Sequence, residues 1–168
     1  MMKMLANVFD KILVILFWFA GILLAFTTVG TCIDTLCRYL LNKPIPWMLE
    51  ITCYIMLYIP FLSVALVLKE KGHIKIDLII DHLSPKNKAR MFFIESLIGG
   101  ATMWVYTMFG AYVTFDFFKR SVLSLQSLKL PMYLILMIIP VGSFLMAIQF
   151  FRESYDAYKQ IEITKLKS

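Results

Sequence analysis

Hydrophobic residues occur in four long uninterrupted blocks. The blocks are residues 12–33, 51–68, 96–115 and 130–151, and none of them contains Asp, Glu, Lys, Arg or His. A helix needs about 20 apolar residues to cross a bilayer, with about 17 to 25 as the usual range. A chain in lipid must satisfy its own backbone hydrogen bonds, so such blocks form helices. The pattern predicts an all-α integral membrane protein, a bundle of four transmembrane helices in a single membrane domain over residues 1–168.

The segment between the second and third blocks, residues 69–95, has a pattern of its own. Apolar residues recur there at helical spacing, with acidic residues on the opposite face: Ile76, Ile79, Ile80, Leu83, Asp77 and Asp81. This predicts a short amphipathic helix in the membrane interface. Ser84 is a candidate N-cap, and Pro85 suits the first position of a helix that continues into the third block.

Two features inside the blocks concern helix geometry. Pro60 and Pro140 lie near the middles of the second and fourth blocks, where each predicts a kink that leaves the carbonyl of Met56 or Leu136 without its helical partner. Neighbouring helices could satisfy these carbonyls, or they could serve as ion ligands. Pairs of small residues four positions apart favour close helix packing: Gly21 with Ala25, Ser96 with Gly100, and Ser143 with Ala147.

Lys and Arg are unevenly divided between the two sides that four spans define. Five lie in the loop after the first block and the loop after the third: Arg38, Lys43, Lys119, Arg120 and Lys129. Twelve lie at the opposite ends of the blocks: Lys3, Lys11, Lys69, Lys71, Lys75, Lys86, Lys88, Arg90, Arg152, Lys159, Lys165 and Lys167. The positive-inside rule therefore predicts that both termini, the loop 69–95 and the tail 152–168 are cytoplasmic.

The composition agrees with a membrane protein, because 60% of the residues are hydrophobic and 17% are charged. Globular chains are nearer to half apolar and a quarter charged. The net charge of +6 is explained by topology and by attraction to anionic headgroups, so no nucleic-acid partner is expected.

Catalytic chemistry is not indicated by any motif. Ionisable residues inside spans are typical of transport pathways, and the four blocks have none, so a complete transporter is not expected from this chain alone. His73, Asp77 and His82 could form a metal site, but solvation of a polar helix face is the favoured interpretation. Cys32, Cys37 and Cys53 are interpreted as small apolar residues, although a four-helix membrane oxidoreductase stays open as the alternative. We predict no enzyme activity, metal or cofactor.

Polar residues gather at two membrane edges and carry a resemblance to a known family. One edge has Arg38-Tyr39, Asn42, Pro46, Trp47 and Glu50, and the other has Gly72-His73-Ile74-x-Ile76-Asp77. With Leu130-Pro131 and Pro140-x-Gly142, this arrangement resembles the DctQ-like small membrane subunit of tripartite ATP-independent periplasmic (TRAP) transporters.

The resemblance implies a subunit of the bacterial inner membrane that scaffolds a large DctM-like transport subunit. It also implies docking by a periplasmic substrate-binding protein, with sodium-coupled uptake of organic acids such as dicarboxylates or sialic acid through the large subunit. At the periplasmic edge it implies binding-protein docking or loop closure by Asp34, Arg38, Asn42, Trp47 and Glu50. At the cytoplasmic edge we expect a fixed turn and contact with lipid headgroups through Lys69, Lys71, His73 and Asp77.

Overall fold

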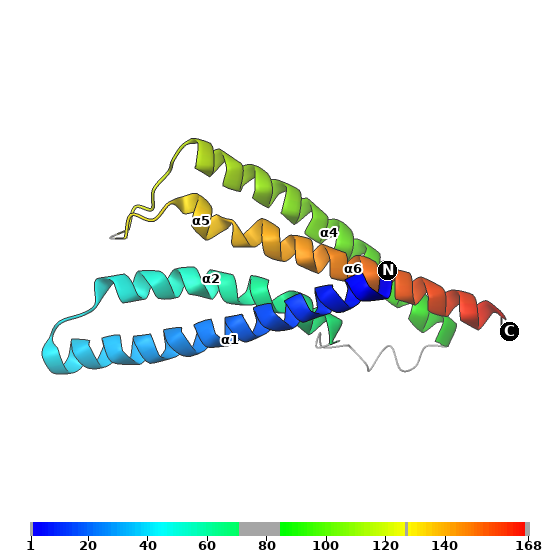
Figure 1. The fold of residues 1–168 in the computed structure, drawn as a ribbon, viewed down its shortest axis with the longest axis horizontal. Helices are drawn as coiled ribbons and strands as arrows, with labels where there is room; N and C mark the ends of the chain where they lie inside the picture. The colour runs from blue at the N-terminus through cyan, green and yellow to red at the C-terminus, as the bar shows by residue number, and fades with distance from the viewer. Residues whose placement is uncertain (1, 71–84, 127, 167–168) are drawn as a thin grey trace.

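The computed structural model describes residues 2–70, 85–126 and 128–166 as helices joined by short connections (Figure 1). The helices are α1 (Met2–Leu41), α2 (Pro46–Lys69), α4 (Pro85–Lys119), α5 (Met132–Leu136) and α6 (Ile138–Leu166). Within these residues, four helical segments are long and apolar enough to cross a membrane: Asn7–Leu41, Pro46–Lys69, Arg90–Lys119 and Met132–Lys159. The predicted all-α membrane class is therefore confirmed. The predicted interfacial helix, with Lys71, His73 and Asp77, lies outside the described residues.

The helices form two antiparallel hairpins that pack through α2 and α6. One hairpin is α1 with α2, and the other is α4 with α5 and α6. The hairpins lie closest together near the N-terminus and diverge toward their loops, where the α4–α5 connection turns back toward α2 (Figure 1). We call the end with residues 34–50 and 116–131 the loop end, and the end with Asp10, Lys69 and Arg152 the terminus end. Each hairpin thus has one inner helix and one outer helix, α1 or α4.

Small residues bring the helices close together at several points. A Cβ on Gly30 of α1 would overlap the side chain of Met48 of α2. A Cβ on Gly142 of α6 would lie 2.6 Å from Cβ of Phe61 of α2. Ser143 and Ala147 are fully buried in α6, as their spacing predicts. A Cβ on Gly21, in contrast, would have no neighbour within 4 Å among the described residues, so none of these helices packs closely against α1 at this position.

The two prolines behave differently. Helix α2 runs through Pro60 without a break. The last span is divided at Met137, directly after Leu136, into α5 and α6. The ring of Pro140 crowds the carbonyl four residues before it, which accounts for the interruption one turn upstream, whereas α2 accommodates the same crowding at Pro60 and stays helical. The same ring lies 3.2 Å from a Cβ built on Gly110, so it also forms part of the α4–α6 contact.

The predicted start of a helix at Pro85 is confirmed, and α4 continues from there without interruption to Lys119. This helix is the least covered of the four spans, since 11% of its most apolar stretch is buried, against 39% for the last span. It is also the least apolar, with a mean hydropathy of 1.2 against 2.2 to 2.6 for the others. The most exposed span is therefore the one least suited to face lipid.

Candidate functional site

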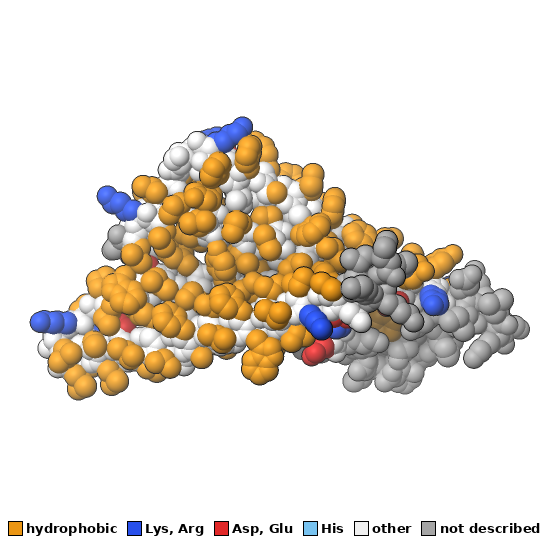
Figure 2. All heavy atoms as spheres, viewed as in Figure 1, with side chains coloured by type: hydrophobic (Ala, Val, Ile, Leu, Met, Phe, Trp, Pro, Cys, Tyr) orange, Lys and Arg blue, Asp and Glu red, His pale blue; other side chains and the backbone are white. Residues whose placement is uncertain are grey.

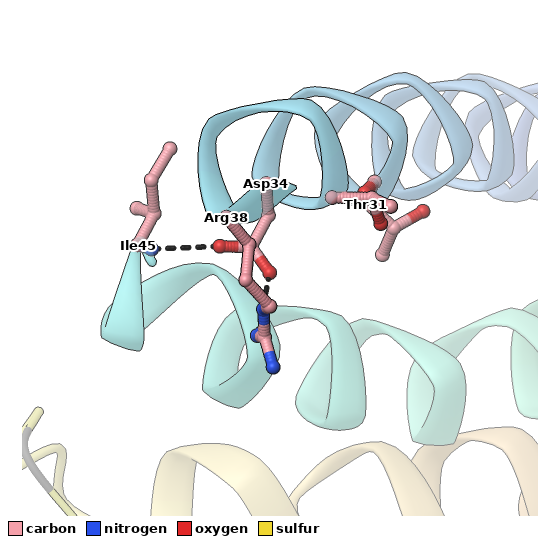
Figure 3. Close-up of polar contacts among 5 residues, drawn as sticks. Thr31, Asp34, Arg38 and Ile45 are labelled. Atoms are coloured by element: carbon pink, nitrogen blue, oxygen red, sulfur yellow. Dashed lines mark hydrogen bonds and ion pairs between the residues drawn. The ribbon is translucent and has the colours of Figure 1, made fainter. Parts of the chain in front are cut away.

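At the loop end, Asp34 ties together the turn between α1 and α2 (Figure 3). Its Oδ1 accepts a 2.7 Å hydrogen bond from the backbone N–H of Ile45, and its Oδ2 accepts a 2.9 Å bond from Nη2 of Arg38. Asp34 is buried, whereas the Arg38 side chain is 56% exposed. The two roles predicted for this pair are loop closure and docking of the binding protein. The hydrogen bond between Asp34 and Ile45 is a contact of the kind that loop closure requires. Docking through Arg38 stays a prediction.

Two other predicted residues flank this turn. Asn42 follows the last residue of α1 with φ 53°, a left-handed conformation that Asn tolerates better than most residues. The next residue, Lys43, donates its N–H to the carbonyl of Cys37, which helps to end α1. Trp47 is exposed in the first turn of α2, which begins with Pro46. Its predicted role in binding-protein docking or loop closure remains a prediction.

Glu50 begins a ladder of polar contacts along α2. Its Oε2 accepts a 2.9 Å hydrogen bond from the N–H of Leu128 in the connection between α4 and α5. One turn later, the hydroxyl of Tyr54 bonds to Ser124 and Gln126, each at 2.7 Å. These contacts fasten the second loop to the first hairpin.

A third rung completes the ladder. The hydroxyl of Tyr58 donates to the carbonyl of Leu134 in α5. The three side chains of α2 follow each other at spacings of four residues, so they lie on one helix face. The spacing of these three residues is present in the sequence. It was overlooked because two of them are tyrosines inside an apolar block, where their hydroxyl groups do not stand out.

The connection that receives these contacts has a compact shape. Helix α4 ends in a Schellman motif: Val122 donates to the carbonyl of Phe117 and Ser121 to that of Phe118, with Ser121 at φ 48°. Leu123 then pairs with Pro131 in an isolated antiparallel bridge. The hydroxyl of Ser124 is thereby held against α2.

At the terminus end, Asp10 of α1 joins three helices. Its carboxylate lies 3.1 Å from Nζ of Lys69 at the end of α2 and 2.7 Å from Nη1 of Arg152 in α6. The guanidinium of Arg152 also lies 5.3 Å from the ring centre of Phe9. Lys69 was expected to contact lipid headgroups, which stays a prediction, and the structure gives it this acidic partner as well. Asp10 and Arg152 were not expected to meet.

The remaining candidate chemistry is limited. All three cysteines, Cys32, Cys37 and Cys53, are free thiols. The described residues contain no group of three or more His, Cys, Asp or Glu that could hold a metal ion. The His73, Asp77 and His82 alternative lies in residues 71–84, outside the described part of the chain.

The fold and these contacts define a multi-pass α-helical membrane protein whose polar groups bind its own helices together at the two membrane edges. Residues 27–160 match the family described as tripartite ATP-independent periplasmic transporters, DctQ component. The match covers most of the chain, which therefore belongs to this family of transporter components. No curated protein matches the chain.

Proposed function

We propose that the chain is the non-catalytic small membrane subunit of a TRAP transporter. It holds the large transport subunit in place and helps a periplasmic binding protein to dock, for sodium-coupled uptake of organic acids such as dicarboxylates or sialic acid through the large subunit. The subunit lies in the inner membrane with its termini in the cytoplasm and its loop end in the periplasm. Family membership supports a role in the transporter, and the Lys and Arg distribution supports this orientation.

The observation that carries the scaffold role is the surface of α4. Lipid tails solvate apolar side chains but provide no hydrogen-bond partner for polar ones. Helix interfaces in membranes, in contrast, are enriched in small and hydroxyl residues. The exposed surface of α4 includes Ala101, Thr102, Tyr106, Ala111 and Tyr112. Because this span combines the lowest burial with the lowest mean hydropathy, we assign its outer face to the large subunit.

A tryptophan placed on that face tests the assignment. Ala101 is exposed on α4, and Ala25 is exposed on α1, the span with the highest mean hydropathy, 2.6. Trp in place of Ala101 inserts a large ring into a protein interface but would be tolerated against lipid. We expect Ala101→Trp to weaken copurification of the large subunit by about tenfold, or ~1.4 kcal/mol, and Ala25→Trp to leave it unchanged.

A folding control completes this experiment. Ala147 is fully buried inside the chain, so Ala147→Trp should lower the amount of folded subunit itself, which Ala101→Trp should not. Normal recovery of the large subunit with Ala101→Trp would refute the assignment of α4. No recovery of a large subunit with the unmodified chain would refute the scaffold role as a whole.

The non-catalytic role has its own test. The chain reconstituted alone should give no sodium-driven uptake, and uptake should require the large subunit and the binding protein. Replacement of Cys32, Cys37 and Cys53 by Ala in the assembled transporter should leave uptake unchanged. Loss of uptake on removal of the thiols alone would favour the membrane oxidoreductase alternative.

A further inference from the structure

The loop end carries more positive than negative charge. Its basic residues are Arg38, Lys43, Lys119, Arg120 and Lys129, and its acidic residues are Asp34, Glu50 and Asp116. Since the positive-inside rule disfavours Lys and Arg on the periplasmic side, this excess calls for an explanation other than topology.

All three carboxylates at this end are engaged in contacts within the chain. Asp34 holds Arg38 and the N–H of Ile45. Asp116 lies 2.9 Å from Nε of Arg120, one helical turn further along α4. Glu50 accepts the N–H of Leu128. Two of the negative charges thus bind loop backbone, and the third pairs with the arginine at the end of α4.

The cations, in contrast, are directed to solvent. The side chains of Arg38 and Arg120 remain 56% and 71% exposed despite their ion pairs. Lys43 and Lys129 are exposed and have no acidic partner among the described residues. Basic side chains stand out from the surface at the loop end in Figure 2, and few acidic atoms are visible there in this view. This end therefore presents a positive potential.

Of the three lysines at this end, Lys119 lies with its Nζ 4.7 Å from the ring centre of Phe115, so the positions of the other two, Lys43 and Lys129, indicate where this potential is directed. Lys43 lies in the connection between α1 and α2, beyond the end of α1 at Leu41. Lys129 follows Leu128, whose N–H is bound to Glu50 in the first turns of α2, one of the inner helices. The second loop is therefore attached to the first hairpin at the loop end. Lys43 and Lys129 both lie in connections between helices there, with exposed side chains that a soluble partner can reach.

We propose that Lys43 and Lys129 form the centre of a docking surface for an acidic face of a soluble protein. The proposal rests on the proposed function, and the soluble protein is then the periplasmic binding protein. Exposed charges of this kind contribute mainly by steering the partner, so they raise the association rate and make it sensitive to salt. The docking role expected at Arg38 and its neighbours stays a prediction, and this proposal adds Lys43 and Lys129, which the sequence analysis counted only for topology.

Charge reversal in the assembled transporter tests the proposal. The double variant Lys43→Glu and Lys129→Glu, purified with the large subunit in nanodiscs, is compared with Lys159→Glu, which reverses an exposed lysine of α6 at the terminus end. The purified binding protein is the probe. We expect the double variant to lower its association rate about tenfold at ~0.05 M salt and much less at ~0.5 M, where charges are screened. Lys159→Glu should have no effect.

Three results would overturn the proposal. The first is an unchanged association rate in the double variant, and the second is an equal loss with Lys159→Glu. The third is weaker binding of the double variant to vesicles of anionic lipid with normal binding-protein association, which would assign both lysines to lipid phosphates. The large subunit is quantified in the same samples. Its presence with an unaffected association rate refutes only this inference, and its absence from the unmodified sample refutes the proposed function.

Discussion

The backbone N–H of Leu128 donates a 2.9 Å hydrogen bond to the carboxylate of Glu50, 78 residues earlier in the chain. The bond joins the connection between α4 and α5 to the first turns of α2. Tyr54 and Tyr58 extend the same attachment along the helix. At the loop end, therefore, hydrogen bonds to a single face of α2 help to hold the two hairpins together.

The first prediction concerns this ladder. Glu50→Ala should destabilise the purified subunit by about 1–3 kcal/mol, because it leaves a partly buried N–H without its acceptor. Glu50→Gln should cost less, since the amide oxygen still accepts a hydrogen bond. Thermal unfolding in a mild detergent measures both changes. Tyr54→Phe should also destabilise the subunit, whereas Tyr106→Phe, on the exposed surface of α4, should not. If Tyr54→Phe and Tyr106→Phe change the unfolding temperature equally, the ladder contributes nothing to the stability of the subunit.

The second prediction separates the two members of the Asp34–Arg38 pair. Asp34→Ala removes the acceptor of the Ile45 N–H together with the ion pair, so it should lower the midpoint of thermal unfolding by several degrees. Arg38→Ala removes only one partner of a largely exposed pair, and such pairs contribute about 0–1 kcal/mol. The comparable pair of Arg120 with Asp116 provides the control, and Arg120→Ala should resemble Arg38→Ala. A larger loss from Arg38→Ala than from Asp34→Ala would contradict this order.

Much of the fold could be predicted because the bilayer imposes long apolar helices. The four blocks, the helix start at Pro85 and the closely packed Ser143 and Ala147 all follow from local pattern and spacing. The contact of Asp10 with Arg152 could not be predicted in this way, because 142 residues separate them. Arg152 was counted only for topology, and Lys69 for topology and headgroup contact, although both are held by one carboxylate. A count of charges indicates on which side of the membrane a residue lies, but not which residue it pairs with.

The third prediction follows from that carboxylate. Asp10→Asn leaves Lys69 and Arg152 near each other without a compensating charge, so it should destabilise the packing of α1 on α2 and α6 by about 1–2 kcal/mol. Asp156→Asn, at an exposed position of α6, should have little effect. Unfolding is measured for both variants in the same detergent.

A second substitution distinguishes repulsion from lost hydrogen bonds. Lys69→Gln in the Asp10→Asn background removes one of the two uncompensated cations and should restore part of the stability. If the double variant is instead as unstable as the sum of both single variants, the two residues act independently and the three-helix cluster is not a unit.

The fourth prediction concerns the end of α4, where Ser121 adopts a left-handed conformation, φ 48°, in the Schellman motif. For a residue with a Cβ this conformation costs about 1–2 kcal/mol, and glycine adopts it freely at a smaller entropic cost. Ser121→Gly should therefore stabilise the subunit by about 0.5–1 kcal/mol. Asn42→Gly, at φ 53°, should gain less, because Asn already tolerates this region. Ser121→Val should destabilise, since a β-branched side chain fits this conformation poorly. If Gly and Val shift the unfolding midpoint in the same direction, the conformation at residue 121 does not determine how α4 ends.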